Sequence, residues 1–263
     1  MTGPSYAALA DAGWPALERA EVGGWRARFS HGVTKRANSA WWAGEAGAGA
    51  GSGAVAGATD ASAGGIAEVE AAYRARGLPP VFQLTGADEA AARRLIGRGY
   101  ALVDETVVMA APVREEPAAA ASVSVTRTPS EEWLDAWWAV DGRGGPAERE
   151  VARAILTGVP ALYAALPVDG VVAAVARVAL VGSWGGLYCV ATLPRFRRRG
   201  LARQVVAGAL AAGAAHGVTD AWLQVLARNE AALALYSGFG FTEVERYRYL
   251  IGKERPLPVA VCR

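Results

Sequence analysis

The chain has 263 residues, of which 52% are hydrophobic and 20% are charged, so it can bury a sizeable core and is not a disordered protein. This length allows one large domain or two small ones. The formal net charge of +2 excludes binding to nucleic acid through bulk positive charge, although it allows a local basic site.

Few residues are of the types that form disulfides or bind metals. The two cysteines, Cys189 and Cys262, are too few for a disulfide scaffold and favour a reducing compartment. No cysteine or histidine cluster has the spacing of zinc ligands, so we expect no metal. The longest apolar stretch, 170–182, is shorter than a membrane span, and the N-terminus lacks the basic segment of a signal peptide. These features predict a cytoplasmic protein that is not bound to a membrane.

Two stretches of biased composition divide the chain. Residues 43–65 are almost all glycine, alanine and serine, a composition typical of a mobile loop. Residues 114–121 (REEPAAAA) are charged, then contain a proline and an alanine run, which is typical of a linker between folding units. We therefore predict an N-terminal domain over 1–113 and a C-terminal domain over 122–263.

Strands and helices alternate in the C-terminal part. Ser130 before two glutamates is a predicted helix cap, and Pro146 opens a second helix. The Asp169-Gly170 pair predicts a hairpin turn between two apolar strands. In chain order the predicted strands are 122–127, 161–166, 171–181, 186–193 and 221–226, the predicted helices begin at 131, 146, 201 and 229, and 241–251 is a last strand or hairpin. The pattern predicts an α/β fold.

The chain also contains an internal repeat. Shifted by 141 positions, 83–100 aligns with 224–241 without a gap, and six of the eighteen positions are identical. The identities include two glycines near the end of the segment, and an aromatic residue follows the second glycine in both copies. A shared strand–helix–strand architecture explains these matches better than chance in an alanine-rich chain. Each half is therefore predicted to end in the same kind of unit.

One segment combines glycine with a cluster of arginines. Residues 192–203 (TLPRFRRRGLAR) leave a predicted strand and enter a predicted helix. Gly200 lets the backbone approach a ligand closely, and the N–H groups of the first helical turn point towards that ligand. Arg198, Arg199 and Arg203 add positive charge, so the segment is a predicted pyrophosphate site. Few aromatic residues accompany the arginines, which argues against a nucleic-acid interface.

Two motifs in the C-terminal part resemble those of the GNAT N-acetyltransferase superfamily. Arg197-x-x-Gly200-x-Ala202 matches the R/Q-x-x-G-x-G/A loop of that superfamily. The next signature of the superfamily is matched at Asn229, Ala232, Leu235, Tyr236, Gly240 and Phe241. Both occur in the expected order, and the resemblance covers about 122–250. The first half, at 36–39 and 77–83, is similar to the degenerate N-terminal half of an actinobacterial two-GNAT family.

The resemblance implies tandem GNAT-like domains, each with a mixed central sheet flanked by helices, and acetyl-CoA as the acyl donor. It implies that backbone groups of Val190, Ala191 and Thr192 bind the acetyl and pantetheine groups, and that Asn229 meets the pantetheine arm. It also implies that Tyr236 is the general acid that protonates the departing CoA thiolate. The implied pyrophosphate site comprises Arg197, Arg198, Arg199, Gly200, Leu201, Ala202 and Arg203. The implied acceptor is a primary amine, on a small molecule or a protein, that attacks the thioester.

The sequence does not identify the general base. Some relatives carry a glutamate on the fifth strand of the domain, but the matching residue here is Gln224, which cannot accept a proton at neutral pH. Asp141, Glu148, Glu243 and Glu245 are candidates, and proton transfer through water or an amine that arrives neutral is equally compatible. Because this carboxylate is missing, a non-catalytic acyl-CoA-binding or sensing module is the alternative function.

The two halves differ in the residues that a working site needs. Tyr236 aligns with Leu95 of the first copy, and no arginine loop precedes the helix predicted over 66–76. We therefore predict one acetyl-CoA site per chain, in the second half. Packing is the expected role of four other residues: Cys189, Trp133, Trp137 and Trp138. One of the three tryptophans can also line the acceptor cleft.

Overall fold

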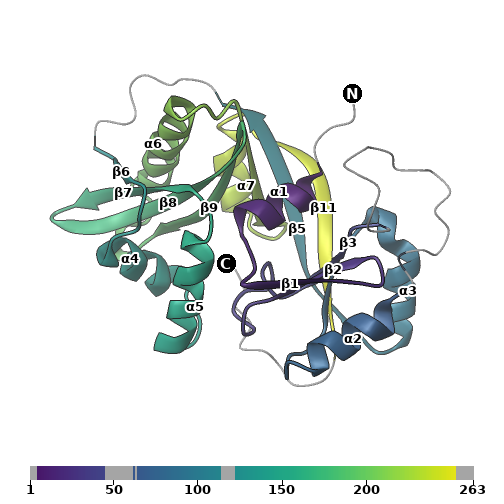
Figure 1. Ribbon diagram of the computed structural model, residues 1–263. Coiled ribbons are helices and arrows are strands. Elements are labelled where there is room, and N and C mark those ends of the chain that lie inside the picture. Colours follow the sequence, from purple (N-terminus) through teal and green to yellow (C-terminus); the bar gives the residue numbers. More distant parts are fainter. Residues whose placement is uncertain (1–4, 45–61, 63, 114–121, 253–263) are drawn as a thin grey trace.

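A computed structural model of the chain describes residues 5–44, 62, 64–113 and 122–252. The loop predicted over 43–65 lies mostly outside these residues, and the linker predicted over 114–121 lies entirely outside them. The described strands form one eleven-stranded mixed sheet in the order β1-β2-β3-β4-β11-β5-β10-β9-β8-β7-β6, with helices on both of its faces (Figure 1). None of the helices in the described ranges has the length and apolar character needed to cross a bilayer.

The first half contains mostly short strands and short helices, and it ends in a long strand. Its strands are β1 (Glu18–Val22), β2 (Trp25–Phe29), β3 (Ala40–Trp42), β4 (Val81–Thr85) and β5 (Ala101–Pro112). Its helices are α1 (Tyr6–Gly13), α2 (Ile66–Arg74) and α3 (Glu89–Gly97), with a 3-10 turn, η2 (Gly86–Asp88), before α3.

The second half has longer elements. Its strands are β6 (Ser124–Thr126), β7 (Ala161–Val168), β8 (Val171–Val181), β9 (Trp184–Thr192), β10 (Asp220–Leu226) and β11 (Thr242–Ile251). Its helices are α4 (Glu131–Asp141), α5 (Pro146–Thr157), α6 (Leu201–Ala215) and α7 (Glu230–Ser237), with the 3-10 turn η3 (Pro194–Phe196) before α6.

The elements of the second half begin where the sequence predicts. The Ser130 hydroxyl caps α4 by accepting a hydrogen bond from the Trp133 N–H at 3.2 Å. Pro146 is the first residue of α5, where its missing N–H costs nothing. The first strand of this half, predicted over 122–127, is shorter, because only Ser124–Thr126 pair with β7.

The two copies of the internal repeat have the same structure. β4 is followed by η2 and α3, and β10 is followed by α7. Each helix ends in a turn that requires a glycine in the left-handed region, Gly99 at φ +86° and Gly240 at φ +82°. The chain then enters a long strand, β5 in the first copy and β11 in the second.

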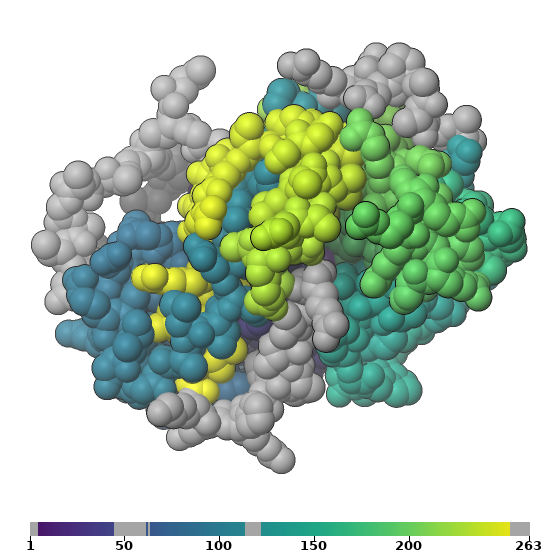
Figure 2. Space-filling view, turned by 180° about the vertical axis from the view of Figure 1, so that it is seen from behind, coloured from purple at the N-terminus to yellow at the C-terminus, as the bar shows by residue number. Residues whose placement is uncertain are grey.

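These two long strands are exchanged between the halves, because each pairs with strands of the other half. β11, from the second half, pairs antiparallel with β4 and β5 of the first half. β5, from the first half, pairs antiparallel with β10 of the second half. In Figure 2, yellow residues from the C-terminal end of the described chain therefore lie among the blue residues of the first half. The sheet is continuous across both halves for this reason.

Helix α1 also packs on the second half. It contacts β8 and β9, and the ring of Trp14, which follows α1, lies 5.3 Å from the ring of Tyr188 on β9. The fully buried Arg177 of β8 donates hydrogen bonds to the carbonyl oxygens of Gly13 at 2.9 Å and Leu156 at 3.1 Å. These bonds offset part of the cost of burying the guanidinium, whose Nη2 has no hydrogen-bond partner among the described residues. This network therefore fixes the start of the chain against the sheet of the second half.

Candidate active site

Two neighbouring parallel strands separate in the middle of the sheet. β10 pairs with β9 only along Asp220–Leu223, against Trp184–Leu187. On its other side β10 remains paired with β5 as far as Leu226. Beyond Leu187 and Leu223, the facing edges of β9 and β10 therefore have no strand partner. Backbone N–H and C=O groups at such an edge are available to an extended ligand.

A β-bulge on β9 lies beside this separation. Cys189 and Val190 stand opposite the single residue Ala176 of β8, and Cys189 has a φ of +54°. An extra residue of this kind interrupts the alternation of a strand. Cys189 consequently does not lie in the core, as its sequence position predicted, but is half-buried and lines a cavity.

The start of α6 faces the same region. Gly200, at φ +75°, precedes the helix, and no side chain caps the N–H groups of its first turn. A Cβ atom built at Gly200 would have its nearest neighbour 4.0 Å away, so the space in front of the helix is open. The positive end of a helix dipole with unpaired N–H groups is a site for anions. Arg198 and Arg203 line the cavity beside it.

A cavity of about 480 Å³ joins these features. Of the site residues predicted from sequence, it brings together all except Ala191 and Arg199 in its lining: Val190, Thr192, Arg197, Arg198, Gly200, Leu201, Ala202, Arg203, Asn229 and Tyr236. The guanidinium of Arg199 lies over the ring of Phe196 instead, 5.6 Å from its centre. The Thr192 hydroxyl is buried and has no hydrogen-bond partner among the described residues.

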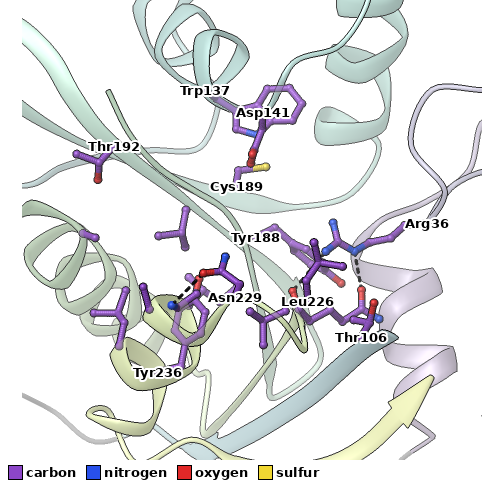
Figure 3. A pocket seen from close by; sticks show the side chains of 18 of the residues that line it. Arg36, Thr106, Trp137, Asp141, Tyr188, Cys189, Thr192, Leu226, Asn229 and Tyr236 are labelled. Atoms are coloured by element: carbon purple, nitrogen blue, oxygen red, sulfur yellow. Dashed lines mark hydrogen bonds between the residues drawn. The ribbon is translucent and has the colours of Figure 1, made fainter. Parts of the chain in front are cut away.

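Two residues of the second motif form one wall of the cavity. The Asn229 side chain caps α7 by accepting a hydrogen bond from the Ala232 N–H at 3.2 Å. Tyr236, on α7, packs its ring against Phe241 at 6.2 Å and is 9% exposed. Figure 3 shows Asn229 and Tyr236 on one side of the cavity, with Asp141 and Cys189 on the opposite side.

Asp141, at the end of α4, contributes a carboxylate to the wall of the cavity. Burial raises the pKa of Asp141, and this effect exceeds the opposing influence of Arg36, Arg143 and a hydrogen bond from Trp137. Trp137 itself lines the cavity, whereas Trp133 is buried and donates its indole N–H to Ala164 at 2.9 Å. Of the four acidic residues considered from sequence, Asp141 lines the cavity, and Glu148, Glu243 and Glu245 do not.

A second carboxylate in the cavity wall, that of Asp104, has its pKa shifted in the opposite direction. Burial pushes its pKa upwards, but hydrogen bonds from Lys35 and Arg228 outweigh that effect and hold the pKa below its usual value. The Arg228 Nη1 lies 2.9 Å from Asp104 Oδ1, and Lys35 forms an ion pair with the other oxygen. Asp104 is therefore a paired anion, whereas Asp141 is the stronger base.

The comparisons with known proteins agree with this geometry. A family model described as "Probable histone acetyltransferase Rv0428c C-terminal" matches residues 6–250. The chain belongs to this family. It is an acyltransferase of the GNAT type.

Relatives of this acyltransferase match it over different lengths. It is 27% identical to "Uncharacterized N-acetyltransferase YobR" of Bacillus subtilis over 92% of this chain and 96% of YobR. It is 38% identical to the [ribosomal protein bS18]-alanine N-acetyltransferase of Salmonella typhimurium over 30% of this chain, and spans 53% of that enzyme. The structure of a GCN5-related N-acetyltransferase from Kribbella flavida has the same fold, with a TM-score of 0.63, 20% identity, and coverage of 95% and 96% of the two chains.

The sequence did not identify which residues of the first half line the acyltransferase cavity. Its residues there are Trp14, Thr34, Lys35, Arg36, Asp104 and Thr106. Apart from Arg36, which falls within the resemblance at 36–39, no local motif marks them. They reach the cavity from the segment after α1, the loop before β3 and the exchanged strand β5. Within the described parts of the chain, no group of three or more histidine, cysteine or acidic residues is arranged to hold a metal ion.

Proposed function

We propose that this acyltransferase moves an acetyl group from acetyl-CoA to a primary amine, with acetyl-CoA bound between β9 and β10. The observation that carries the proposal is the single cavity that extends from the uncapped start of α6, along the separated strands, to Asp141. The same cavity brings together an anion site, an unpaired strand edge and the half-buried carboxylate of Asp141. We also propose that the protein acts in the cytoplasm, the location that its sequence predicts.

The residues present fit acetyl-CoA. The N–H groups of Leu201, Ala202 and Arg203, with the Arg198 side chain, provide positive charge and donors for the pyrophosphate. The edge of β9 from Val190 to Thr192 offers backbone groups to the pantetheine arm and an N–H to polarise the thioester carbonyl.

Asp141 is the proposed general base. A base that works near neutral pH needs a pKa near that pH, and burial moves the pKa of Asp141 in that direction. Deprotonation of the acceptor ammonium by Asp141 yields the neutral amine that attacks the thioester carbon. Asp141 thus supplies the carboxylate that is missing at Gln224. Because that missing carboxylate was the reason to consider a non-catalytic sensing module, the case for the module is weaker.

Tyr236 is the proposed general acid. Tyr236 projects from α7, and its ring packs against Phe241. It lies on the side of the cavity opposite Asp141, so the proposed base and acid are on two sides of the separated strands. Transfer of its phenol proton to the CoA sulfur avoids release of a free thiolate. The ammonium loses two protons in all: the first goes to Asp141 before the attack and is later released to solvent, and the second leaves the nitrogen of the tetrahedral intermediate and restores the Tyr236 phenol after CoA has departed as the thiol.

The first half is proposed to be a GNAT-like unit, over 1–113, that has lost its own site. Its order of elements, β3-α2-β4-α3-β5, repeats the order β9-α6-β10-α7-β11 of the second half, over 122–263. It lacks the arginine loop and carries Leu95 where the second half has Tyr236. Its remaining role is then to supply one wall of the cavity, through α1, the loop before β3, and β5.

The test is CoA release with a panel of amines, run together with calorimetric binding of acetyl-CoA. The panel contains amino acids, a polyamine, an aminoglycoside, a lysine peptide and a peptide that begins with alanine, the residue acetylated by the Salmonella relative. Turnover of at least one amine is the expected result. Binding of acetyl-CoA without turnover of any amine would favour the sensing module, and absence of both would overturn the assignment.

A further inference from the structure

We propose that Asp104 of the first half is a positioning residue for acetyl-CoA: by binding Arg228 it fixes the start of α7, and with it Asn229, at the wall of the cavity. This inference rests on the proposed function and adds a positioning residue to the proposed acetyl-CoA site. It comes from a carboxylate that the exchanged strand β5 brings to the cavity.

Asp104 occupies an irregular position in β5. The residues on either side of it, Val103 and Glu105, pair with consecutive residues of β11, so Asp104 is the extra residue of a β-bulge. Its φ is +48°, in the left-handed region that aspartate tolerates better than most residues other than glycine. A conformation of this kind persists where the surrounding contacts hold it. The partners of the Asp104 carboxylate must therefore hold it in place.

Two cations from different segments bind this carboxylate. Lys35, in the loop before β3, forms an ion pair with one oxygen of Asp104, and Arg228 Nη1 lies 2.9 Å from the other. The side chains of Lys35 and Asp104 are only 8% and 9% exposed, so solvent screens their charges little. Arg228 is 59% exposed and reaches Asp104 from the turn between β10 and α7. Asp104 therefore joins that turn to the wall that the first half contributes.

Helix α7 depends on this turn for its position. All of its residues lie in the described part of the chain, and Tyr236 is the one buried residue among them. Arg228 directly precedes Asn229, the cap of α7, and the Ala227 N–H donates a hydrogen bond to the Glu105 carbonyl oxygen at 2.9 Å. The turn is thus tied to β5 at two adjacent residues of that strand. Asn229 and Tyr236 line the cavity (Figure 3), so the position of the turn determines where they lie.

The repeat provides an internal comparison. The shift of 141 positions that aligns the two copies also pairs Asp104 with Glu245 of β11. Arg228 aligns with Ala87, which carries no charge. Burial raises the pKa of Glu245, and the nearby carboxylate of Asp88, before α3, raises it further. The exchanged strand therefore places its carboxylate beside a cation at the start of α7 and beside another carboxylate at the start of α3.

The first variant removes the tether without leaving a buried charge alone. Arg228→Met deletes the exposed arginine and keeps the ion pair between Lys35 and Asp104. Acetyl-CoA must then order the turn before α7 when it binds. We therefore expect its affinity, measured by calorimetry without an acceptor, to fall about tenfold. Arg228→Lys keeps a cation within reach of Asp104 and should recover most of the affinity.

A second variant distinguishes a tether from a direct contact between Arg228 and acetyl-CoA. Lys35→Met with Asp104→Asn removes the buried ion pair as a unit, so neither charge is left alone, and it keeps the charge of Arg228. If Arg228 acts through Asp104, this double variant weakens binding as much as Arg228→Met does, and all three changes together weaken it no further. Calorimetric stoichiometry reports the folded fraction, so each affinity refers to folded protein.

Two further measurements separate positioning from a general loss of stability. Asn229→Ala should weaken acetyl-CoA binding much less in the Arg228→Met background than in the wild type, because the untethered Asn229 is already poorly placed. Glu70→Gln is the matched control. Glu70 is 5% exposed and accepts hydrogen bonds from Arg98 at 3.1 Å and Tyr100 at 3.0 Å, outside the cavity lining. Its replacement should lower the melting temperature and leave the affinity for acetyl-CoA unchanged.

Three outcomes would overturn the inference. They are wild-type affinity in Arg228→Met, wild-type affinity in the variant that lacks both Lys35 and Asp104, and losses that add when the changes are combined. Each of them requires a wild type that binds acetyl-CoA, so each leaves the proposed function intact. Failure of the wild type itself to bind acetyl-CoA would instead count against the proposed function, on which the inference rests.

Discussion

The starts of α2 and α6 occupy equivalent places in the two halves, yet only one of them is open. Both helices follow a glycine in the left-handed region, Gly65 at φ +67° and Gly200 at φ +75°. A Cβ atom at Gly65 would lie 2.4 Å from the carbonyl oxygen of Gly23, because the β1–β2 turn covers the helix start. At Gly200 the nearest atom is 4.0 Å away. The two helix starts therefore differ both in what covers them and in sequence, because an arginine loop precedes α6 and none precedes α2.

The parallel strands of the two halves show a similar contrast. In the second half, β9 and β10 part around a cavity, whereas around β3 and β4 aromatic side chains fill the space. The ring of Trp25 lies 5.1 Å from Phe82 and 5.5 Å from Trp42, and Phe82 lies 5.6 Å from Tyr100. Packed aromatic rings exclude a ligand and contribute stability instead. The repeat has thus been used once for a site and once for a core.

The largest expected effect comes from closing the open helix start. Arg198→Glu combined with Gly200→Asp places negative charge and a side chain where the pyrophosphate is proposed to bind. Because this opposes both the helix dipole and the arginine charges, we expect the affinity for acetyl-CoA to fall at least about a hundredfold. Calorimetry measures the change. Arg195→Glu is the matched control, since Arg195 lies over Phe196 outside the cavity lining, and its affinity should change little.

Asp141→Asn should have the next largest effect. Loss of the base is expected to lower kcat about a hundred- to a thousandfold. Because burial raises the pKa of Asp141 and the base works deprotonated, wild-type kcat/KM should fall as the pH drops through that raised pKa. The variant should lose this acidic limb. An unchanged pH profile in the variant would assign the limb to another group, such as the acceptor amine.

Tyr236→Phe should reduce turnover by about ten- to a hundredfold, because the phenol proton is lost while the ring keeps its packing against Phe241. Acetyl-CoA affinity should change little. Leu95→Tyr is the mirror change in the first half, and it should create no activity of its own. Full turnover of Tyr236→Phe at every pH, measured when chemistry limits the rate, would remove Tyr236 from the mechanism.

The smallest effects come from two aligned residues that precede the last helix of each half. Asn229 caps α7, and Asp88 holds the turn before α3 by accepting a hydrogen bond from the Thr85 N–H at 2.8 Å. Replacing either by alanine should cost about 1 kcal/mol of unfolding free energy, read from denaturant titration. Only Asn229→Ala should also weaken acetyl-CoA binding. Equal loss of binding in both variants would show that the two halves are not functionally distinct.

Sequence reasoning succeeds for structure that depends on neighbouring residues and fails for structure that depends on contacts between distant parts of the chain. Caps, prolines and glycines act locally, so the starts of α4 and α5 and the turn between β7 and β8 were predictable. The strand exchange depends on pairing between β5 and β10, which are far apart in the chain, and no local pattern encodes it. Cys189 was assigned to the core because alternation assumes a regular strand, and the bulge breaks that assumption.

The site was predictable only where motifs exist. The arginine loop, Asn229 and Tyr236 follow a superfamily pattern, and the structure gathers them around one cavity. Asp141 was one of four acidic candidates, and only burial beside the cavity distinguishes it from the other three. The hydrogen bond from Arg36 to Gln224 could not be predicted, because it exists only once the two halves have folded together.

The central claim is that one half binds acetyl-CoA and the other does not. Calorimetric titration of the full chain with acetyl-CoA tests it most directly. We predict one acetyl-CoA per chain in the wild type, and no measurable binding after Arg198→Glu with Gly200→Asp. Two acetyl-CoA molecules per chain, or one that still binds with wild-type affinity in that double variant, would contradict the claim.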